Sequence, residues 1–200
     1  MIDPSAIDMA KLCARAYTDP PTYGNPQGSG RAHVYDGIVV FRVTDDPAAM
    51  LTDRDIATVT IPQLGTLHDG FWDAFGEIAG DLIKLKPQII AGHSLGAALA
   101  LIYAGELCRA EHAPSAVYAF EPPRLAMDGT LKALLDAHGV MRFCTRNGLD
   151  PVTEVPPWMM LPADLSSIGT VTGTLDLISY HMIDHVIAAL GPSVAPHGAV

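Results

Sequence analysis

The segment at residues 88–101 restricts the fold of this chain more than any other part of the sequence. It reads QIIAGHSLGAALAL. The apolar run at 89–91 is typical of a buried strand, and the Ala- and Leu-rich stretch after Gly96 is typical of a helix. We expect Gly92 and Gly96 where strand and helix come too close for larger side chains. The segment predicts a nucleophile elbow with Ser94 as the nucleophile; the alternative is an ordinary Gly-rich turn.

Length and composition indicate one globular domain, residues 1–200. No apolar run approaches the roughly 20 residues that span a bilayer, so we expect no integral membrane segment. The formal net charge is −10 and the chain has no basic cluster, which argues against a nucleic-acid partner. Transient contact with lipid surfaces through apolar groups stays open.

Cysteine and histidine usage bears on location and on metals. The N-terminus has neither the basic start nor the apolar core of a secretory signal, and three cysteines is an odd count. Both features favour reduced thiols and a cytoplasmic location, with export by another route left open. The eight histidines show no H-E-x-x-H spacing and the cysteines no C-x-x-C spacing, so we expect no protein-held metal and no cofactor.

Helical and strand patterns alternate along the chain. The expected helices are residues 3–17 with Asp3 as N-cap, 69–86 with Asp69 as cap, the elbow helix after 94, 128–138 and 180–190. The expected strands are a hairpin over 33–44 turning at Asp36-Gly37, then 56–61, the elbow strand, 115–120 and 139–145, with a terminal hairpin at 168–178. Residues 45–54 read as a loop or short helix. The fold class is therefore α/β, with a mostly parallel central sheet flanked by helices and ligands at the carboxyl ends of its strands.

A serine nucleophile needs a base, and the base needs an orienting carboxylate. Asp150 follows the strand predicted at 139–145, although an Asp-Pro pair is also an ordinary turn starter. His181 and His185 come later, one helical turn apart, and one base is enough. We favour His181 because it stands where a loop enters the last helix, and loops usually carry catalytic groups. His185 is the alternative base.

Four motifs resemble, in order, the signatures of the fungal-type class 3 lipases. They are FRVT at 41–44, LHDGF at 67–71, GHSLG at 92–96 and NGLDPV at 147–152. Members of that family are α/β-hydrolases that cleave the carboxylic esters of acylglycerols. The resemblance runs from residue 41 to the last helix and implies a compact α/β-hydrolase-like variant of the class 3 lipase fold.

The resemblance also implies roles for individual residues. Thr44 would give its backbone N–H, and often its hydroxyl, to the oxyanion hole, and Leu95 would give a second N–H. The family acid carries over to Asp150 and the family base to His181, with His185 standing where an aromatic residue usually follows.

Other positions near the motifs have different meanings. His68 and His93 are interpreted as packing and hydrogen-bonding residues. The sequence departs from the family at Val43, where Gly is usual, and the stretch between Thr44 and His68 is short for a full amphipathic lid. Apolar residues at 50–51 and 158–161 either line an acyl pocket or belong to the core and surface.

These observations predict a serine carboxylic-ester hydrolase, a lipase or esterase that acts on acylglycerol-type or other apolar esters through an acyl-serine intermediate. An acyltransferase or a phospholipase using the same triad is an alternative, because the triad sets the chemistry and the pocket sets the substrate. A non-catalytic binding protein on a hydrolase fold is an alternative of another class, and it predicts that Ser94→Ala leaves biological activity intact.

Overall fold

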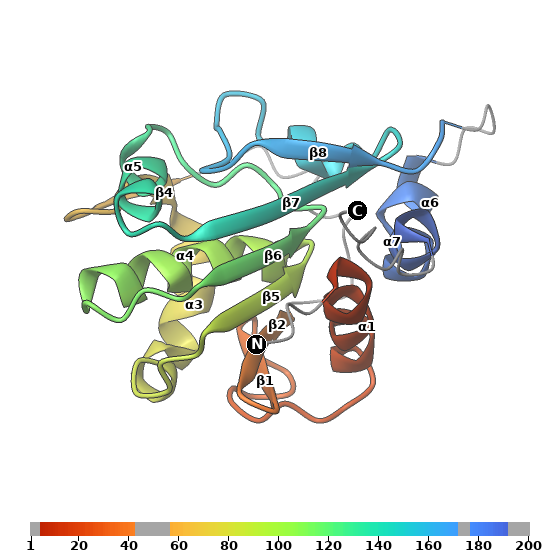
Figure 1. Cartoon of the computed structure of the whole chain (residues 1–200). Helices are drawn as coiled ribbons and strands as arrows, with labels where there is room; N and C mark the ends of the chain where they lie inside the picture. Colours follow the sequence, from red (N-terminus) through yellow and green to blue (C-terminus); the bar gives the residue numbers. More distant parts are fainter. Residues whose placement is uncertain (1–4, 43–56, 172–176, 192–200) are drawn as a thin grey trace, which may run out of the picture.

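The protein is described here by a computed structural model that covers residues 5–42, 57–171 and 177–191. Its centre is a six-stranded sheet in the order β1-β2-β5-β6-β7-β8 (Figure 1). The strands are β1 (Arg31–Tyr35), β2 (Ile38–Arg42), β5 (Ile89–His93), β6 (Ala116–Phe120), β7 (Met141–Asn147) and β8 (Leu165–Ile168). Strands β1 and β2 are antiparallel, and all other neighbours are parallel. The prediction of a mostly parallel central sheet is confirmed.

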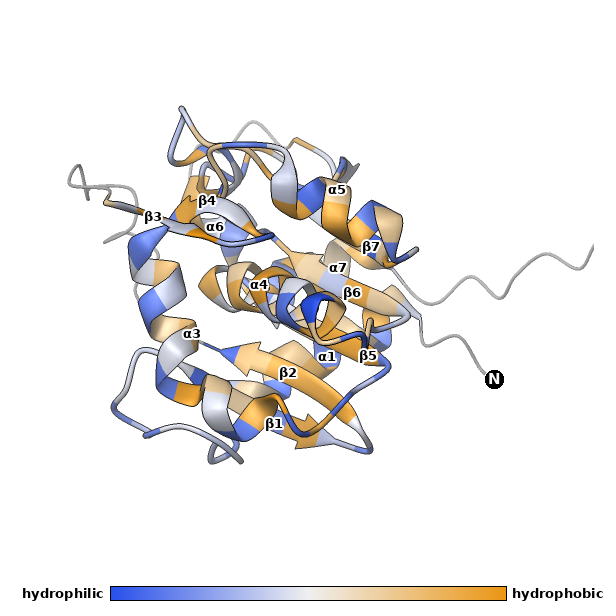
Figure 2. Ribbon diagram, turned by 90° about the vertical axis from the view of Figure 1, so that its left-hand side faces the viewer, coloured by the Kyte–Doolittle hydropathy of each residue, from blue (hydrophilic) through white to orange (hydrophobic). Residues whose placement is uncertain are grey.

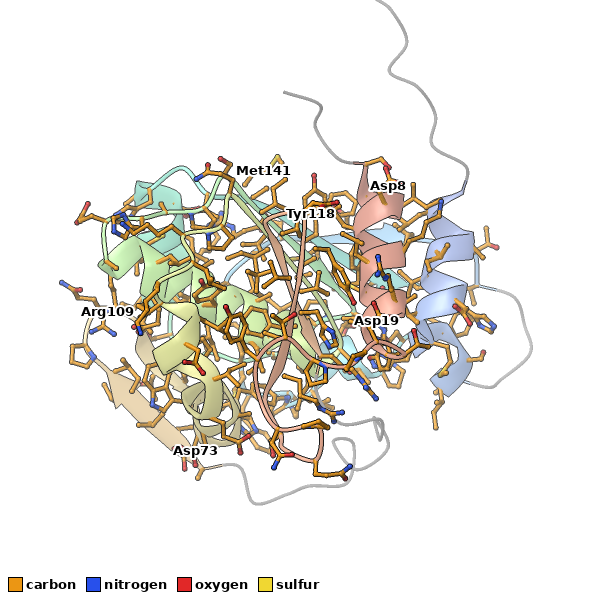
Figure 3. All side chains as sticks on the ribbon, turned by 90° about the horizontal axis from the view of Figure 1, so that it is seen from below. Asp8, Asp19, Asp73, Arg109, Tyr118 and Met141 are labelled. Carbon is orange, nitrogen blue, oxygen red and sulfur yellow. The ribbon has the colours of Figure 1, made fainter. Side chains whose placement is uncertain are left out.

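Helices cover both faces of this sheet. On one face lie α3 (Asp69–Leu82), α4 (Leu95–Arg109) and α5 (Thr130–Ala137), and on the other lie α1 (Ala6–Ala16) and α7 (Ile183–Leu190), preceded by α6 (Leu177–His181). Alternating side chains of the strands build a core on each face, because successive residues point to opposite sides. Ile90 faces the first core, whereas Ala91 and Tyr118 face the second. Figure 3 shows α1 and α7 side by side, with Tyr118 beside α1.

Helix α4 holds the first face together. Twelve of its fifteen residues are buried, so it is an internal helix rather than a surface one. It contacts strands β2, β5 and β6 on one side and helices α3 and α5 on others. A helix that is apolar all round needs such surroundings, and Figure 2 shows the apolar strands beside it. The Ala- and Leu-rich stretch after the elbow therefore fixes where the elbow sits in the fold.

The N-terminal elements follow the predictions with two changes of cap. Helix α1 begins after Ser5, whose hydroxyl accepts from the backbone N–H of Asp8, so the predicted cap at Asp3, which lies outside the described residues, is wrong. The hairpin of β1 and β2 turns at Asp36-Gly37 as predicted, both with left-handed φ. In α3, Asp69 is the first helical residue rather than the cap, where its charge favours the helix N-terminus.

Two strands were not predicted. Strand β4 (Gly65–His68) pairs antiparallel with β3 (Thr58–Ile61) in a separate two-stranded sheet, so the strand expected at 56–61 is not part of the main sheet. Strand β8 adds to the edge of the main sheet beside β7. Both missed strands are four residues long, and β8 reads Leu-Ser-Ser-Ile, so neither carries the apolar run that identifies a buried strand.

The C-terminal part differs from the prediction in two ways. The hairpin expected at 168–178 is wrong at its described ends, because Ile168 ends strand β8 and Ile178 lies in helix α6; residues 172–176 lie outside the described residues. The helix expected at 180–190 is two helices, since Met182 has an extended backbone with ψ 131°. The loop expected at 45–54 also lies outside the described residues. Among the described helices none has the length and apolarity to cross a membrane.

The close approach of β5 to α4 generates a prediction about stability. A Cβ on Gly92 would stand 2.2 Å from the backbone oxygen of Gly96, which only a backbone shift can relieve. We expect Gly92→Ala to lower the free energy of unfolding by about 3 kcal/mol or more. Gly76, in the interior of α3, has nothing within 4 Å of such a Cβ, so Gly76→Ala is the matched control and should stabilise by about 1 kcal/mol. Equal urea midpoints for the two variants would contradict this packing argument.

Candidate active site

Ser94 lies in the turn between β5 and α4 with an unusual backbone conformation. Its φ is 59° and its ψ is −131°, which costs a residue with a Cβ about 1–3 kcal/mol. The backbone N–H of Ser94 donates to the Phe120 oxygen at 2.9 Å, which ties the turn to the end of β6. The strained strand–turn–helix that the sequence predicts is confirmed, and it holds the serine at the carboxyl end of the sheet.

His181 connects Ser94 to Asp150. It is the last residue of α6 and is buried. Its Nε2 lies 2.7 Å from the Ser94 Oγ, and its Nδ1 lies 2.7 Å from Oδ2 of Asp150. The three residues therefore form one hydrogen-bonded chain that is assembled from three distant parts of the sequence.

Asp150 is fully buried in the turn that follows β7. Its backbone N–H donates to the Asn147 oxygen at 3.1 Å, and its Oδ1 accepts from the backbone N–H of Val152 at 2.9 Å. A carboxylate can only accept, so the proton of His181 sits on Nδ1 and points at Asp150. The Nε2 lone pair is then directed at the Ser94 hydroxyl, which is the tautomer that base catalysis requires.

The structure thus brings together Ser94, Asp150 and His181, while their catalytic roles stay a prediction. Leu95 is the first residue of α4, where a backbone N–H has no intrahelical acceptor. Thr44, the other predicted oxyanion residue, lies outside the described residues. His185 is exposed in α7. It does not share a helix face with His181, because the extended backbone of Met182 separates α6 from α7.

A second histidine lies beside the base of the site, with the ring centroids of His93 and His181 4.9 Å apart. His93 is buried, its Nε2 lies 2.7 Å from the backbone oxygen of His181, and its Nδ1 lies 2.8 Å from the Tyr17 hydroxyl. A carbonyl oxygen only accepts, so Nε2 carries the proton and Nδ1 accepts from Tyr17. Burial, together with the neighbouring His181, lowers the pKa of His93 to about 3. His93 is therefore a neutral hydrogen-bonding residue that holds the backbone of His181, in agreement with its interpretation from the sequence.

Glu121 is a site neighbour that sequence reasoning missed. It is fully buried and follows β6, between the strands that carry Ser94 and Asp150. Burial and a hydrogen bond with the Asp150 carboxyl raise the pKa of Glu121 to about 9. The sequence does hold a signal for it, because an acidic residue directly after a buried parallel strand belongs at the ligand-binding edge of the sheet.

The other features predicted around the site have different outcomes. Within 158–161, Met159 is buried, whereas Trp158 and Met160 are exposed, so this segment is not a uniform pocket wall. Residues 50–51 lie outside the described residues. In the described ranges there is no group of three His, Cys, Asp or Glu residues that could hold a metal ion. The expectation that the protein needs no metal stays a prediction.

Comparison with known sequences gives one family. A profile of the family described as "Lipase (class 3)" matches residues 38–160. Phospholipase A1 EG1 of Oryza sativa subsp. indica is 31% identical over 116 residues, covering 46% of this chain and 26% of the relative. Secreted mono- and diacylglycerol lipase A of Penicillium cyclopium is 34% identical over 98 residues, covering 44% of this chain and 31% of the relative. The matched parts thus span about a quarter to a third of these relatives.

Solved structures of fungal lipases share the fold. The lipase of Rhizomucor miehei in its propeptide complex has a TM-score of 0.66 at 21% identity, over 82% of this chain and 67% of that one. A mutant form of MDLA from Penicillium cyclopium has a TM-score of 0.61 at 22% identity, over 77% of this chain and 64% of that one. The profile match covers more than half of the sequence, and the fold is the α/β-hydrolase type of these lipases: the chain belongs to the class 3 lipase family.

Proposed function

We propose that this chain is a serine carboxylic-ester hydrolase that acts on acylglycerol-type or other apolar esters. The observation that carries the proposal is the hydrogen-bonded chain from the Ser94 Oγ through His181 to Asp150, with both contacts of the imidazole at 2.7 Å. Such a chain is what a serine hydroxyl needs in order to act as a nucleophile near neutral pH. Membership of the class 3 lipases supports the same reaction.

In the first half of the reaction the ester carbonyl is attacked by the Ser94 Oγ while His181 Nε2 takes the hydroxyl proton. Asp150 accepts from Nδ1–H and stabilises the imidazolium that forms. The oxyanion of the tetrahedral intermediate accepts from the backbone N–H of Leu95 and, by the family resemblance, from Thr44. One such donor is worth about 3 kcal/mol in other enzymes.

The second half returns the enzyme to its starting state. The imidazolium of His181 protonates the departing alcohol, and the C–O bond to that alcohol breaks, leaving an acyl-serine. A water molecule then attacks the acyl carbonyl while His181 takes one of its protons. Collapse of the second intermediate releases the carboxylic acid and gives the proton back to the Ser94 oxygen.

Three exposed apolar side chains support an apolar substrate and transient contact with lipid surfaces. Leu149 directly precedes Asp150, Ile178 lies three residues before His181, and Met182 directly follows His181. Exposed apolar side chains near a site favour binding of apolar ligands. The names of the relatives include a mono- and diacylglycerol lipase and a phospholipase A1, so acylglycerols and phospholipids are the two lipid classes to test.

Substitutions at the two histidines and the serine test the proposal. We expect Ser94→Ala and His181→Ala each to lower kcat on p-nitrophenyl esters by about 10⁴-fold or more, because each removes a member of the triad. His185→Ala is the matched control, since His185 is exposed and lies in α7, whereas His181 ends α6. It should stay within about twofold of the wild type, as surface substitutions usually do.

The substrate panel should combine esters of increasing acyl length with diacylglycerols and phosphatidylcholine, each below and above its solubility limit. Turnover that survives Ser94→Ala would contradict the mechanism. Absence of wild-type turnover on every ester would favour the non-catalytic binding protein, and faster transfer to an added alcohol than to water would favour the acyltransferase.

The buried His93 generates a prediction about acid stability. Its pKa is about 3 in the folded protein and ordinarily 6.5, so between these values the unfolded chain binds a proton that the folded protein does not. Stability should therefore fall as the pH drops from 6.5 towards 3. Urea unfolding across this range should show a shallower fall for His93→Gln than for the wild type. His112→Gln, which changes an exposed histidine, is the control and should follow the wild type.

A further inference from the structure

Glu121 is a carboxylic acid in a buried position with a strained backbone, which is an unusual place for such a side chain. Its φ is 53°, a left-handed conformation in which a residue with a Cβ is strained, and its side chain is fully buried. Its backbone N–H donates to the Thr145 oxygen at 3.1 Å, which joins the ends of β6 and β7. The sheet order places this residue between the strands that lead to Ser94 and Asp150.

The carboxyl group of Glu121 is surrounded by partners from β7 and the loop after it. One oxygen accepts from the Thr145 hydroxyl at 3.1 Å, and the other accepts from the backbone N–H of Asn147 at 2.8 Å. Besides burial, the neighbouring Asp150 carboxyl group raises the pKa of this carboxyl group, both as a hydrogen-bond partner and through its charge. Asn147 in turn donates from its side-chain Nδ2 to the Tyr180 oxygen at 2.9 Å, immediately before His181. Glu121 therefore links β6, β7 and the acid of the triad.

Two buried carboxyl groups in contact cannot both be charged, and two carboxylates cannot hydrogen-bond to each other without a shared proton. Asp150 accepts from the Nδ1–H of His181 and from the backbone N–H of Val152. Each carboxyl group has two donors, but only Asp150 accepts from the base of the triad, so the proton is assigned to Glu121. Burial acts in the same direction, because it raises the pKa of this carboxyl group.

We propose that Glu121 is a positioning residue of the hydrolase site proposed above: its carboxyl group stays protonated and donates a hydrogen bond to the Asp150 carboxylate. Asp150 then has donors on three sides, namely Glu121, Val152 and His181. Three donors leave its carboxylate one orientation, in which Oδ2 faces the imidazole. Glu121 acts on the reaction only through Asp150 and needs no contact with the substrate.

The charged groups around the pair leave this proton in place. Arg124, which follows Glu121 by three residues, and Arg146 of β7 are both ion-paired with Glu154. The remaining titratable groups of the site are His181, which faces Asp150, and His93, which is held neutral. The charge that acts on Glu121 is that of Asp150, and it opposes ionisation.

The proposal predicts how the protein responds to alkaline pH. The pKa of Glu121 is raised from 4.5 to about 9, so between these values the folded protein holds a proton that the unfolded chain lacks. The corresponding stability is complete below pH 4.5 and is lost as the pH rises towards 9. Above that value the Asp150 carboxylate loses one donor and faces a second negative charge.

Infrared spectroscopy tests the proton directly. Near neutral pH the wild type should show the C=O stretch of a protonated carboxylic acid, and Glu121→Gln should remove that band. Glu106→Gln, which changes a carboxylate paired with Arg109 in α4, is the control and should leave the band in place. The measurement needs no turnover and can be repeated on Ser94→Ala protein, so it decides on the shared proton even if no ester is hydrolysed. A wild type without the band would overturn the proposal.

The pH dependence of kcat tests the positioning role. Glutamine keeps a donor for Asp150 but cannot ionise, so kcat of the wild type should fall above pH 9 while kcat of Glu121→Gln should not. Glu121→Ala should lower kcat roughly tenfold near neutral pH, the effect that loss of an outer-shell hydrogen bond has in metal sites, and Gln at the same position should restore most of it. A residue that only supports the fold would give Glu121→Gln and wild type the same alkaline limb, and that result would overturn the proposal.

Thermal unfolding provides a second readout that is independent of activity. Between pH 5 and 9 the midpoint of the wild type should fall relative to that of Glu121→Gln, because only the wild type loses the stabilising proton. Parallel curves would contradict a protonated Glu121, even where Glu121→Ala fails to fold. If wild type and Glu121→Gln behave as expected but Ser94→Ala keeps its turnover, the proposed mechanism fails and the shared proton stands.

Discussion

The contact between the end of β5 and the start of α4 is the constraint on which the rest of the site depends. Ser94 is held at a φ of 59° because strand and helix meet without a side chain between them. A Cβ on Gly92 would strike the backbone of Gly96, and a Cβ on Gly96 would lie 2.3 Å from the Phe41 oxygen of β2. The strain is offset by the burial of α4, whose apolar surface is enclosed by the sheet and two helices.

Parallel pairing turns this local constraint into a site. Strands β5, β6 and β7 are neighbours in the sheet, and each is followed at its carboxyl end by a polar side chain, namely Ser94, Glu121 and Asp150. Residues about 30 positions apart in sequence thereby become neighbours in space. His181 comes from the end of α6, which the extended backbone of Met182 separates from α7.

Much of this was predictable where the signal is local. Glycines identify the elbow and the turn at Asp36-Gly37, and a continuous apolar run identifies the strand that precedes Glu121. Strand β8 was missed because its edge position lets it carry two serines, and its strand character comes from pairing with β7. The hydrogen bond between the Tyr17 hydroxyl and His93 Nδ1 joins residues 76 positions apart. It forms only because α1 packs against the sheet. Glu121 was missed for the same reason, since its partners lie in β7 and beyond.

The two groups that sequence reasoning left out of the site share one electrostatic logic. Burial lowers the pKa of His93, a base, and raises that of Glu121, an acid, so in both residues it favours the neutral form. Each uses its neutral form to make hydrogen bonds: His93 donates to the His181 backbone, and Glu121 is proposed to donate to Asp150. The Asp150 carboxylate then carries the charge of this buried cluster, and the imidazolium formed during the proposed reaction is its counter-ion. Because neither neutral neighbour competes for that role, the stabilisation of the imidazolium by Asp150 is kept for the reacting base.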